Sequence, residues 1–502
     1  MIAEFDTHLL SIDRDSFMQL MSESTDFRRL IATTFSHRMR DVLSGKKARR
    51  FARHVIFVVP PHQDIDIPFD VARRLAGRGE RLALVARTAL AENNVHSIQL
   101  DVDQLGEIWN RTQSKDFDRV VFVVDAEFAT QRVELIEKAD EVLWCFFPDR
   151  HKQIYDLATQ VIVESPIDTS KLKRVCLLND DQRVAPPNIV DDRLHKRDFI
   201  MPAKCTDKSS QMYGQGIDRL TRHLCDVKIG LSLAGGGARG LVHFGVLAAL
   251  EREQVSFDMM SGTSAGAMFG ISYATALGID FLVDAYTKDL TPGFPFTWMP
   301  DPNRSFLIWK YRSRGWDAML RPYFDAHLEQ LQIPFSAVSV DLVGGKVVVT
   351  DRGDVIPAML ESLNLPGIAA PIMRDGMALV DGGVLNNLPA DVLVDKGADF
   401  VVGVNVSADM AKEFGRNVPG MKTQEMKRVG NVETLFRVLE VMGAGTSKAQ
   451  RNNVDVLVVP DTSQHSFTDF TKGKELAEIG ESAVEGCLSD IKNKIAELMK
   501  FR

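Results

Sequence analysis

The stretch LSLAGGGARGLVHFGVLAAL, residues 231–250, places a glycine-rich loop between an apolar strand and an apolar helix. Gly235, Gly237 and Gly240 have the spacing G-x-G-x-x-G, which occurs in loops that bind the phosphates of dinucleotides. A glycine loop at a helix N-terminus also presents backbone N–H groups, which can hold the oxyanion of an ester under attack. On this loop alone, both chemistries stay open.

A second motif, GTSAG at residues 262–266, fits the pattern G-x-S-x-G. In that pattern a serine lies on a sharp turn between a strand and a helix. Gly262 and Gly266 let the backbone bend and leave the hydroxyl of Ser264 accessible. The strand VSFDMM precedes the motif and an apolar helix follows it. The motif therefore predicts a nucleophile, and a close-packed glycine turn without chemistry is the alternative.

A serine hydroxyl needs a base within hydrogen-bond distance to act as a nucleophile at neutral pH. Asp381 is the candidate, because it ends an apolar strand and precedes Gly382-Gly383, which remove bulk around the carboxylate. A plain Asp-Gly-Gly turn is the alternative. His327 and His465 lie in polar settings, and His243 is interpreted as a packed residue of the helix after the glycine loop.

The dinucleotide interpretation needs an acidic residue at the end of the next strand, where it would bind a ribose. Asp258 is near that position, but the Ser264 turn occupies the strand end itself. If the two strands are neighbours in a parallel sheet, the glycine loop and the serine lie side by side at its carboxyl edge and face one substrate.

Two α/β blocks are expected to carry these motifs. Over residues 52–200, the apolar runs HVIFVVPP, RLALVAR, RVVFVVDA, EVLWCFF and RVCLLND alternate with helical stretches, as in a Rossmann-like domain with a buried parallel sheet. The sequence PPHQDID after the first strand is not a P-loop, so the role of this block is left open. Polar residues and prolines from Asn179 to about Gly216 predict a linker or long surface loop.

The second block, residues 226–420, holds the motifs. It contains the strand VKIGLSLA, the hairpin FSAVSVDLVGGKVVVTD turning at Gly344-Gly345, and the strand FVVGVNV. Residues 421–502 predict an extension packed on this block, with a helix over 432–448, the strand VDVLVVP and one closing helix from about 474. Residues 1–50 predict a strand and two helices, too few to form a domain alone.

The composition is that of a globular protein without a nucleic-acid partner. The chain has 502 residues, a net charge of −8 and 25% charged residues, so no basic balance favours nucleic acid. Its five cysteines lack C-x-x-C spacing, which argues against zinc or a disulfide framework and favours a reducing compartment. No signal peptide or membrane-spanning run is visible. We therefore expect a cytoplasmic protein whose membrane contact is peripheral, at the inner face. Its oligomeric state is not indicated.

Four motifs together resemble the patatin-like phospholipases. GGGARG, GTSAG, PGIAAP (366–371) and DGG (381–383) occur in the order and spacing of that family, over roughly residues 228–407. More loosely, the outer segments resemble the bacterial branch related to neuropathy target esterase. Residues 1–50 resemble the end of a cyclic-nucleotide-binding domain without its ligand-holding part, so no nucleotide binding is expected. The segment AAPIM departs from the aromatic-proline pair of many relatives, at a pocket wall.

The resemblance implies a three-layer α/β/α catalytic domain with a Ser-Asp dyad and no metal or cofactor. Ser264 would attack the carboxyl ester of a phospholipid or lysophospholipid, Asp381 would take the proton, and water would release the fatty acid from an acyl-enzyme. The backbone N–H groups of the glycine loop would hold the oxyanion, those of Gly236, Gly237 and Ala238 directly, and Arg239 would orient the loop. The loop as a whole comprises Gly235, Gly236, Gly237, Ala238, Arg239 and Gly240.

Two other functions stay open at this point. One is a Ser-Asp-His α/β-hydrolase that uses His465 as the base. The other is a regulatory module that senses a lipid or nucleotide without catalysis.

A proline-broken stretch over residues 290–311, LTPGFPFTWMPDPNRSFLIWKY, concentrates aromatic and apolar side chains. It predicts either a wall for an acyl chain, a flap that touches a membrane, or a loop that covers the core.

Overall fold

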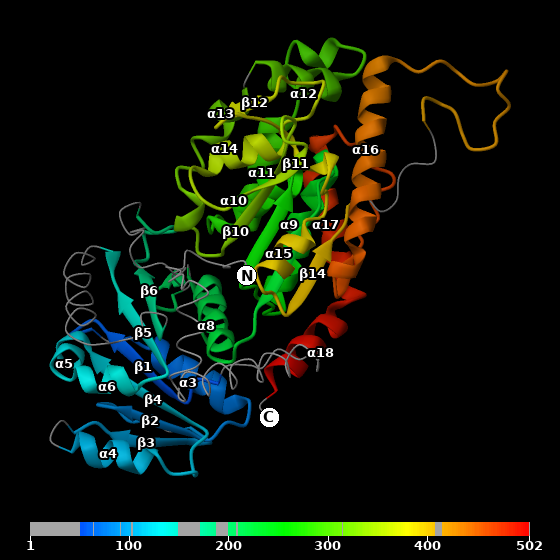
Figure 1. Ribbon diagram of the computed structural model, residues 1–502. Coiled ribbons are helices and arrows are strands. Elements are labelled where there is room, and N and C mark those ends of the chain that lie inside the picture. Colours follow the sequence, from blue (N-terminus) through cyan, green and yellow to red (C-terminus); the bar gives the residue numbers. More distant parts are fainter. Residues whose placement is uncertain are drawn as a thin grey trace, which may run out of the picture.

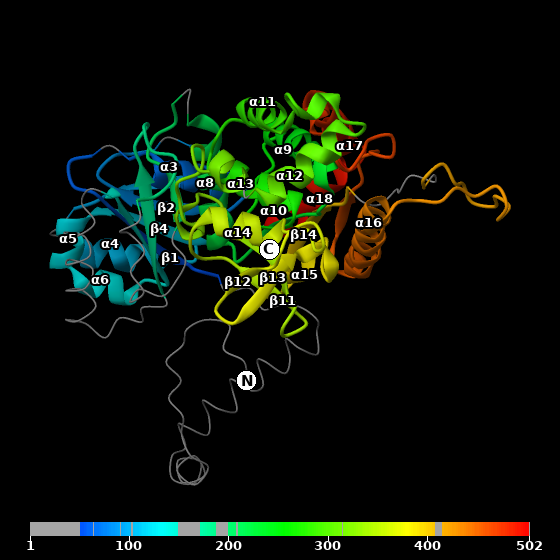
Figure 2. The same cartoon turned by 90° about the horizontal axis from the view of Figure 1, so that it is seen from above.

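The computed structural model describes residues 51–63, 65–90, 92–101, 104–148, 171–186, 199–206, 209–313, 315–406 and 414–500. These residues form two β-sheets with flanking helices, one sheet in the first part of the chain and one in the second (Figures 1 and 2). The elements predicted within residues 1–50, and their resemblance to a cyclic-nucleotide-binding domain, lie outside the described residues.

The first sheet, sheet A, is parallel throughout, with the strand order β3-β2-β4-β1-β5-β6-β7. The five strands predicted from apolar runs are confirmed, whereas β3 and β7 were not predicted. β3 lies at the sheet edge with only one buried residue, so it carries no continuous apolar run. The strands are β1 (His54–Val59), β2 (Leu82–Ala86), β3 (Val95–Gln99), β4 (Arg119–Asp125), β5 (Glu141–Phe146), β6 (Leu172–Leu178) and β7 (Phe199–Pro202).

Part of the predicted linker is regular structure, so that prediction is wrong for its second half. β7 and the start of helix α8 (Ser210–Leu224) lie within it. The helix packs closely on β7, because a Cβ at Gly216 would lie 2.7 Å from the Cβ of Met201. Its buried face includes Arg219, which donates to the carbonyl of Ile200 (2.9 Å). Only the first residues of α8 lie within the predicted linker, and they include Gly214 and Gly216, which do not favour a helix in sequence.

The other helices around sheet A are α3 (Ile67–Gly77), α4 (Leu105–Thr112), α5 (Ala126–Gln131) and α6 (Val133–Lys138).

The second sheet, sheet B, has the order β12-β13-β10-β9-β8-β14-β15, and β11 pairs with β10. Its central strands are parallel, and β11, β12 and β13 add antiparallel pairings on one side. Because β15 extends the sheet, residues after 421 contribute to the same layer as the motifs. The strands are β8 (Ile229–Leu233), β9 (Met259–Thr263), β10 (Phe335–Asp341), β11 (Lys346–Thr350), β12 (Ile372–Arg374), β13 (Met377–Asp381), β14 (Phe400–Val404) and β15 (Val456–Val458).

Sheet B is covered on both faces, which makes this part an α/β/α arrangement. Along β14, Phe400 and Val402 belong to the core under α9 and α10, whereas Val401 faces the core under α15. Figure 2 shows α9, α11 and α17 on one side and α15 on the other. The single closing helix predicted from about 474 is wrong, since the chain forms two helices, α17 and α18, that meet at Gly486 and Cys487.

The main helices of this part are α9 (Val242–Arg252), α10 (Ala265–Ala274), α11 (Ile279–Leu290), α12 (Pro302–Arg312), α13 (Gly315–Leu320), α14 (Val355–Ser362), α15 (Ala390–Asp395), α16 (Asn431–Ala449), α17 (Gly473–Glu485) and α18 (Leu488–Met499). Within the described residues, no helix combines the length and the apolar character needed to cross a membrane.

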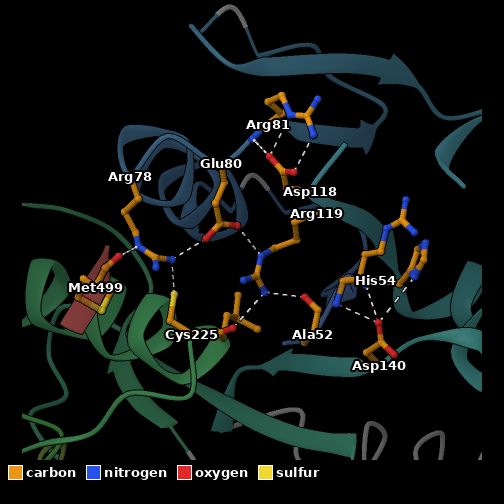
Figure 3. A network of polar contacts seen from close by, with 12 residues as sticks. Ala52, His54, Arg78, Glu80, Arg81, Asp118, Arg119, Asp140, Cys225 and Met499 are labelled. Atoms are coloured by element: carbon orange, nitrogen blue, oxygen red, sulfur yellow. Dashed lines mark hydrogen bonds and ion pairs between the residues drawn. The ribbon is translucent and has the colours of Figure 1, made fainter. Parts of the chain in front are cut away.

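Two arginines from the sheet A region bind the C-terminal ends of two helices, α8 and α18 (Figure 3). Arg119 donates to the carbonyl of Leu224 at the end of α8 (3.1 Å), and Arg78 donates to the carbonyl of Met499 at the end of α18. Both positions favour a cation, because a helix C-terminus carries partial negative charge. Glu80 lies between the two guanidinium groups and pairs with both, at 2.8 Å from Arg119 and 2.5 Å from Arg78.

Replacing Glu80 with glutamine is expected to lower the free energy of unfolding by about 3 kcal/mol, because it leaves the fully buried Arg119 without its counter-charge. Thermal unfolding followed by circular dichroism would show the change as a lower midpoint temperature. Asp118→Asn is the matched control: its partner Arg81 is 55% exposed, so the expected loss is below about 1 kcal/mol. Equal shifts in the two variants would contradict this account.

Candidate active site

Ser264 lies on the turn from β9 into α10, with φ 55° and ψ −120°. A residue with a Cβ rarely adopts such a conformation, so the surrounding structure must hold it. The backbone N–H of Ser264 donates to Ser362 Oγ (2.8 Å), and that hydroxyl donates to the carbonyl of Val338 (2.6 Å). The turn is also too tight for side chains at its flanks, because a Cβ at Gly262 would lie 2.5 Å from the carbonyl oxygen of Gly266.

Ser264 is mostly buried, at 7% exposure, and α10 behind it is buried at all ten positions. A helix that is apolar on every side belongs inside a domain. The turn therefore stands on a rigid central element.

The glycine loop follows β8, the strand next to β9, so the predicted side-by-side arrangement of loop and serine is confirmed. Gly237 has φ +59°, which glycine adopts without strain, and it begins a short 3₁₀ turn (Gly237–Leu241) before α9. Gly240 packs on the serine helix, since a Cβ there would lie 2.6 Å from the Cβ of Ala265.

The three predicted oxyanion donors differ in their hydrogen bonding. The N–H of Ala238 donates to the carbonyl of Phe467 (2.8 Å). Among the described residues, the N–H groups of Gly236 and Gly237 have no hydrogen-bond partner. In this conformation, Gly236 and Gly237 therefore retain donors for an oxyanion, and Ala238 does not.

Asp381 ends β13 and is 5% exposed. Its Oδ1 accepts a hydrogen bond from the N–H of Gly383 (2.8 Å), while Oδ2 is buried without a hydrogen bond of standard geometry among the described residues. Burial raises the pKa of Asp381 to about 6, against the opposing effects of the nearby Ser264 hydroxyl and the Gly383 N–H. A carboxylate with this pKa is ionised at neutral pH and is a stronger proton acceptor than an exposed aspartate.

One cavity of ≈ 30 Å³ brings these groups together. It has room for only a few water molecules, far less than the several hundred Å³ typical of a small-molecule site. The cavity as it stands is therefore too narrow for a lipid substrate. The lining residues are Gly235, Gly236, Arg239, Ser264, Leu365, Asp381, Gly383, Val384, Asn387, Leu439, Glu440, Gly443 and Phe467.

Residues 461–470, here called the covering segment, close this cavity from above the glycine loop. Phe467 lines the cavity and its carbonyl binds the N–H of Ala238. Arg239, only 5% exposed, donates to the carbonyl of His465 (2.8 Å) and forms an ion pair with Glu440 of α16 (3.0 Å). Arg239 thus ties the glycine loop to both the covering segment and α16.

None of the three histidines considered from sequence lines the cavity. His243 is fully buried and its Nε2 contacts the carbonyl of Ala234 (2.8 Å); burial lowers its pKa to about 4. The ring of His465 faces Glu475 (3.8 Å), and that of His327 faces Glu329 (3.6 Å). This geometry gives no support to a triad with His465.

Two supporting residues were missed in the sequence analysis. Asn387 donates through Nδ2 to the carbonyl of Gly235 (3.1 Å) and to Ser447 Oγ of α16 (3.1 Å). Ser362 holds the serine turn, as described above. Asn387 follows the DGG motif closely in the sequence NNLP, which was a usable signal, whereas no local pattern marks Ser362.

Replacing Ser362 with alanine is expected to lower kcat by about tenfold, with a smaller change in KM, because the Ser264 N–H loses its partner and the nucleophile turn loosens. Steady-state kinetics on a soluble ester would measure both constants. Ser362→Thr keeps the hydroxyl and should recover part of the rate. An alanine variant with unchanged kcat would show that the turn does not depend on this bond.

A strained serine between a strand and a helix, a buried carboxylate and Gly236 with its free backbone N–H line one cavity, an arrangement of the kind that serine hydrolases use. No cluster of three or more His, Cys, Asp or Glu suited to a metal occurs in the part of the chain that the structure describes.

Comparison with known proteins places this site in a family. Residues 231–394 match the patatin-like phospholipase family. An uncharacterised NTE family protein of Mycobacterium tuberculosis is 28% identical over 286 residues, which cover 54% of this chain and 48% of that protein. Patatin-like phospholipase domain-containing protein 6 of Homo sapiens is 28% identical over 327 residues, covering 59% and 23%. Lysophospholipase NTE1 of Mycosarcoma maydis is 32% identical over 197 residues, covering 38% and 10%.

This part of the chain belongs to the patatin-like phospholipase family, and the proteins that it resembles include members of the NTE family. The predicted family is thereby confirmed. The chain spans about half the length of the mycobacterial relative and less of the other two.

Proposed function

We propose that this chain hydrolyses the carboxyl ester of a phospholipid or lysophospholipid through a Ser-Asp dyad. The observation that carries the proposal is the cavity that Ser264 shares with the buried carboxylate of Asp381 and the glycine loop. The match to the patatin-like phospholipase family and the relative named as a lysophospholipase support a lipid as the substrate.

In the proposed reaction, Ser264 Oγ attacks the ester carbonyl as Asp381 takes its proton. The N–H groups of Gly236 and Gly237 stabilise the oxyanion, and that of Ala238 joins them once the Phe467 carbonyl has moved away. The intermediate collapses to an acyl-enzyme when Asp381 returns the proton to the leaving alkoxide. Water, deprotonated by Asp381, then releases the fatty acid and restores Ser264.

The predicted domain boundaries, the cytoplasmic location and the absence of a nucleic-acid partner are part of the same proposal. The described residues hold no membrane-spanning helix, and the net charge of −8 does not favour nucleic acid.

Two readouts on the unmodified protein test this function. A fluorophosphonate probe should form an adduct, and peptide mass spectrometry should locate it on the peptide that contains Ser264. Free fatty acid should appear from lysophosphatidylcholine or phosphatidylcholine. An adduct on another residue would contradict Ser264 as the nucleophile. An adduct at Ser264 without fatty acid release from either lipid would support a hydrolase and contradict a lipid substrate.

A further inference from the structure

Four large apolar side chains are exposed in the segment between α11 and α12 and on α12 itself. Trp298 is 84% exposed, Phe294 79%, Trp309 47% and Met299 41%. The rings of Phe294 and Trp298 contact each other edge to face, with centroids 5.8 Å apart. We call these four residues the aromatic patch. Large exposed apolar side chains clustered in this way mark an interaction site more often than ordinary protein surface.

The segment that carries the aromatic patch is packed against helix α12. Phe296, between its exposed neighbours, packs its ring against Phe306 (5.2 Å) and Trp309 (5.4 Å) of α12. Asp301 caps α12 by accepting a hydrogen bond from the N–H of Arg304 (3.1 Å). The exposed side chains are therefore held outward by a helix and not displayed by an unsupported loop.

The patch is continuous with the apolar wall of the catalytic cavity. On α12, Ile308 and Tyr311 pack on a small buried core made of Leu365, Ile368 and Phe436, and Leu439 and Phe467 pack on the same core. Leu365, Leu439 and Phe467 also line the cavity. Figure 1 shows α12 and the first turns of α16 at the same end of the molecule, and the Arg304 guanidinium lies 6.0 Å from the Phe436 ring of α16. An apolar path thus runs from the patch to the active site.

The chemistry of the patch fits a lipid surface. From residue 290 to residue 300 the chain has no charged residue, in a protein in which one residue in four is charged. Tryptophan and phenylalanine favour the boundary between lipid headgroups and acyl chains, where an aromatic body is buried and a polar edge stays wet. The small volume of the cavity adds a second reason, since a lipid can enter only after the apolar side chains around the cavity have separated.

We propose that the aromatic patch docks this chain on the surface of a phospholipid bilayer, beside the point where lipid enters the cavity. The second part of this statement rests on the proposed function. Insertion of Phe294 and Trp298 anchors α12 at the bilayer. The side chains of its inner face then move away from the serine, together with the covering segment, whose Phe467 packs on the same small core. Docking depends on apolar burial and not on lipid charge.

The test compares two double variants on phosphatidylcholine vesicles. Phe294→Ser with Trp298→Ser removes the patch, and Leu342→Ser with Val343→Ser removes similarly exposed apolar residues (52% and 69%) from the β10–β11 turn. All proteins carry Ser264→Ala, so binding is measured without hydrolysis and independently of the proposed function. Removing the patch is expected to weaken vesicle binding by about 100-fold, while the control binds as the parent does.

Several outcomes would overturn the docking proposal: equal binding by both double variants, no binding by the parent, or binding abolished by high salt, which would indicate charge and not apolar burial. Sedimentation velocity tests a different occupant, because a patch-dependent dimer with unchanged vesicle binding would assign the patch to a second copy of this chain. With Ser264 restored, the patch variant should cleave p-nitrophenyl butyrate at the parental rate, as Phe294 and Trp298 do not line the cavity. A parallel loss on this soluble ester would show that the patch shapes the active site instead.

If the unmodified protein binds vesicles but hydrolyses no lipid, the docking proposal is supported and the proposed function is contradicted.

Discussion

Ser264→Ala is expected to lower kcat/KM for ester hydrolysis by at least about 10³-fold, because no acyl-enzyme can form without the nucleophile. The substitution removes one oxygen from a cavity and leaves the backbone contact to Ser362 in place. The variant should therefore fold as the parent does, and its thermal midpoint should stay close to that of the parent. Fatty acid release and fluorophosphonate labelling would both be measured, and both should be lost.

Ser313→Ala is the matched control, since Ser313 is exposed and does not line the cavity. It should retain full activity and full labelling. Residual activity of Ser264→Ala near the parental level would mean that another group attacks the ester, and the dyad would have to be abandoned.

The part of the site that was predicted from sequence is the part built from local signals. The glycine loop and the Ser264 turn each join a strand to a helix within a few residues, and their spacing is visible in the sequence. Their adjacency follows from the parallel pairing of β8 and β9, which short apolar runs with intervening helices predict. Asp381 was found for the same reason, at the end of a strand followed by glycines.

The parts that were not predicted depend on contacts between distant segments. Arg239 binds the carbonyl of His465, which is 226 residues away in the sequence, and no pattern in the covering segment predicts this contact. Ser362 likewise reaches the serine turn only through the fold. Its hydroxyl binds the carbonyl of Val338 in β10, and β10 pairs with β9, the strand that leads into the turn. Such backbone–side-chain bonds use ordinary serine and arginine residues, so neither composition nor periodicity reveals them.

The same reasoning explains the errors in the fold. β3 and β7 are short edge or near-edge strands, and α8 buries polar residues that have partners. In each case contacts between distant segments stabilise the element, and no local sequence pattern predicts it.

Asp381→Asn is the second substitution with a large expected effect. An amide cannot take the proton of Ser264, so kcat/KM should fall by at least about 10³-fold. Asp375→Asn, in the exposed turn of the same β12–β13 hairpin, removes one charge without touching the cavity and should be fully active. An Asp381→Asn variant with parental activity would show that this carboxylate is not the base.

The pKa of about 6 also fixes a pH dependence in the parent. Only the ionised carboxylate accepts a proton, so kcat/KM should decrease as the pH falls through about 6, approaching tenfold per pH unit below it. The measurement is a pH–rate profile on a neutral ester. A profile that stays flat down to pH 4 would contradict a base with this pKa.

Stability should change in the opposite direction to activity. The native pKa of Asp381 lies above its ordinary value of 3.8, so the native state binds the proton more tightly than the unfolded chain does. The contribution of Asp381 to the free energy of unfolding is then largest below pH 3.8 and decreases as the pH rises through about 6, by about 3 kcal/mol in total. Asn at this position is neutral at every pH and should recover much of that loss. The inactive Asp381→Asn variant should therefore unfold at a higher temperature than the parent at neutral pH, and the difference should shrink at acidic pH. A buried charge that lowers stability at neutral pH, and that catalysis requires at the same pH, is the physical mark of a functional carboxylate rather than a structural one.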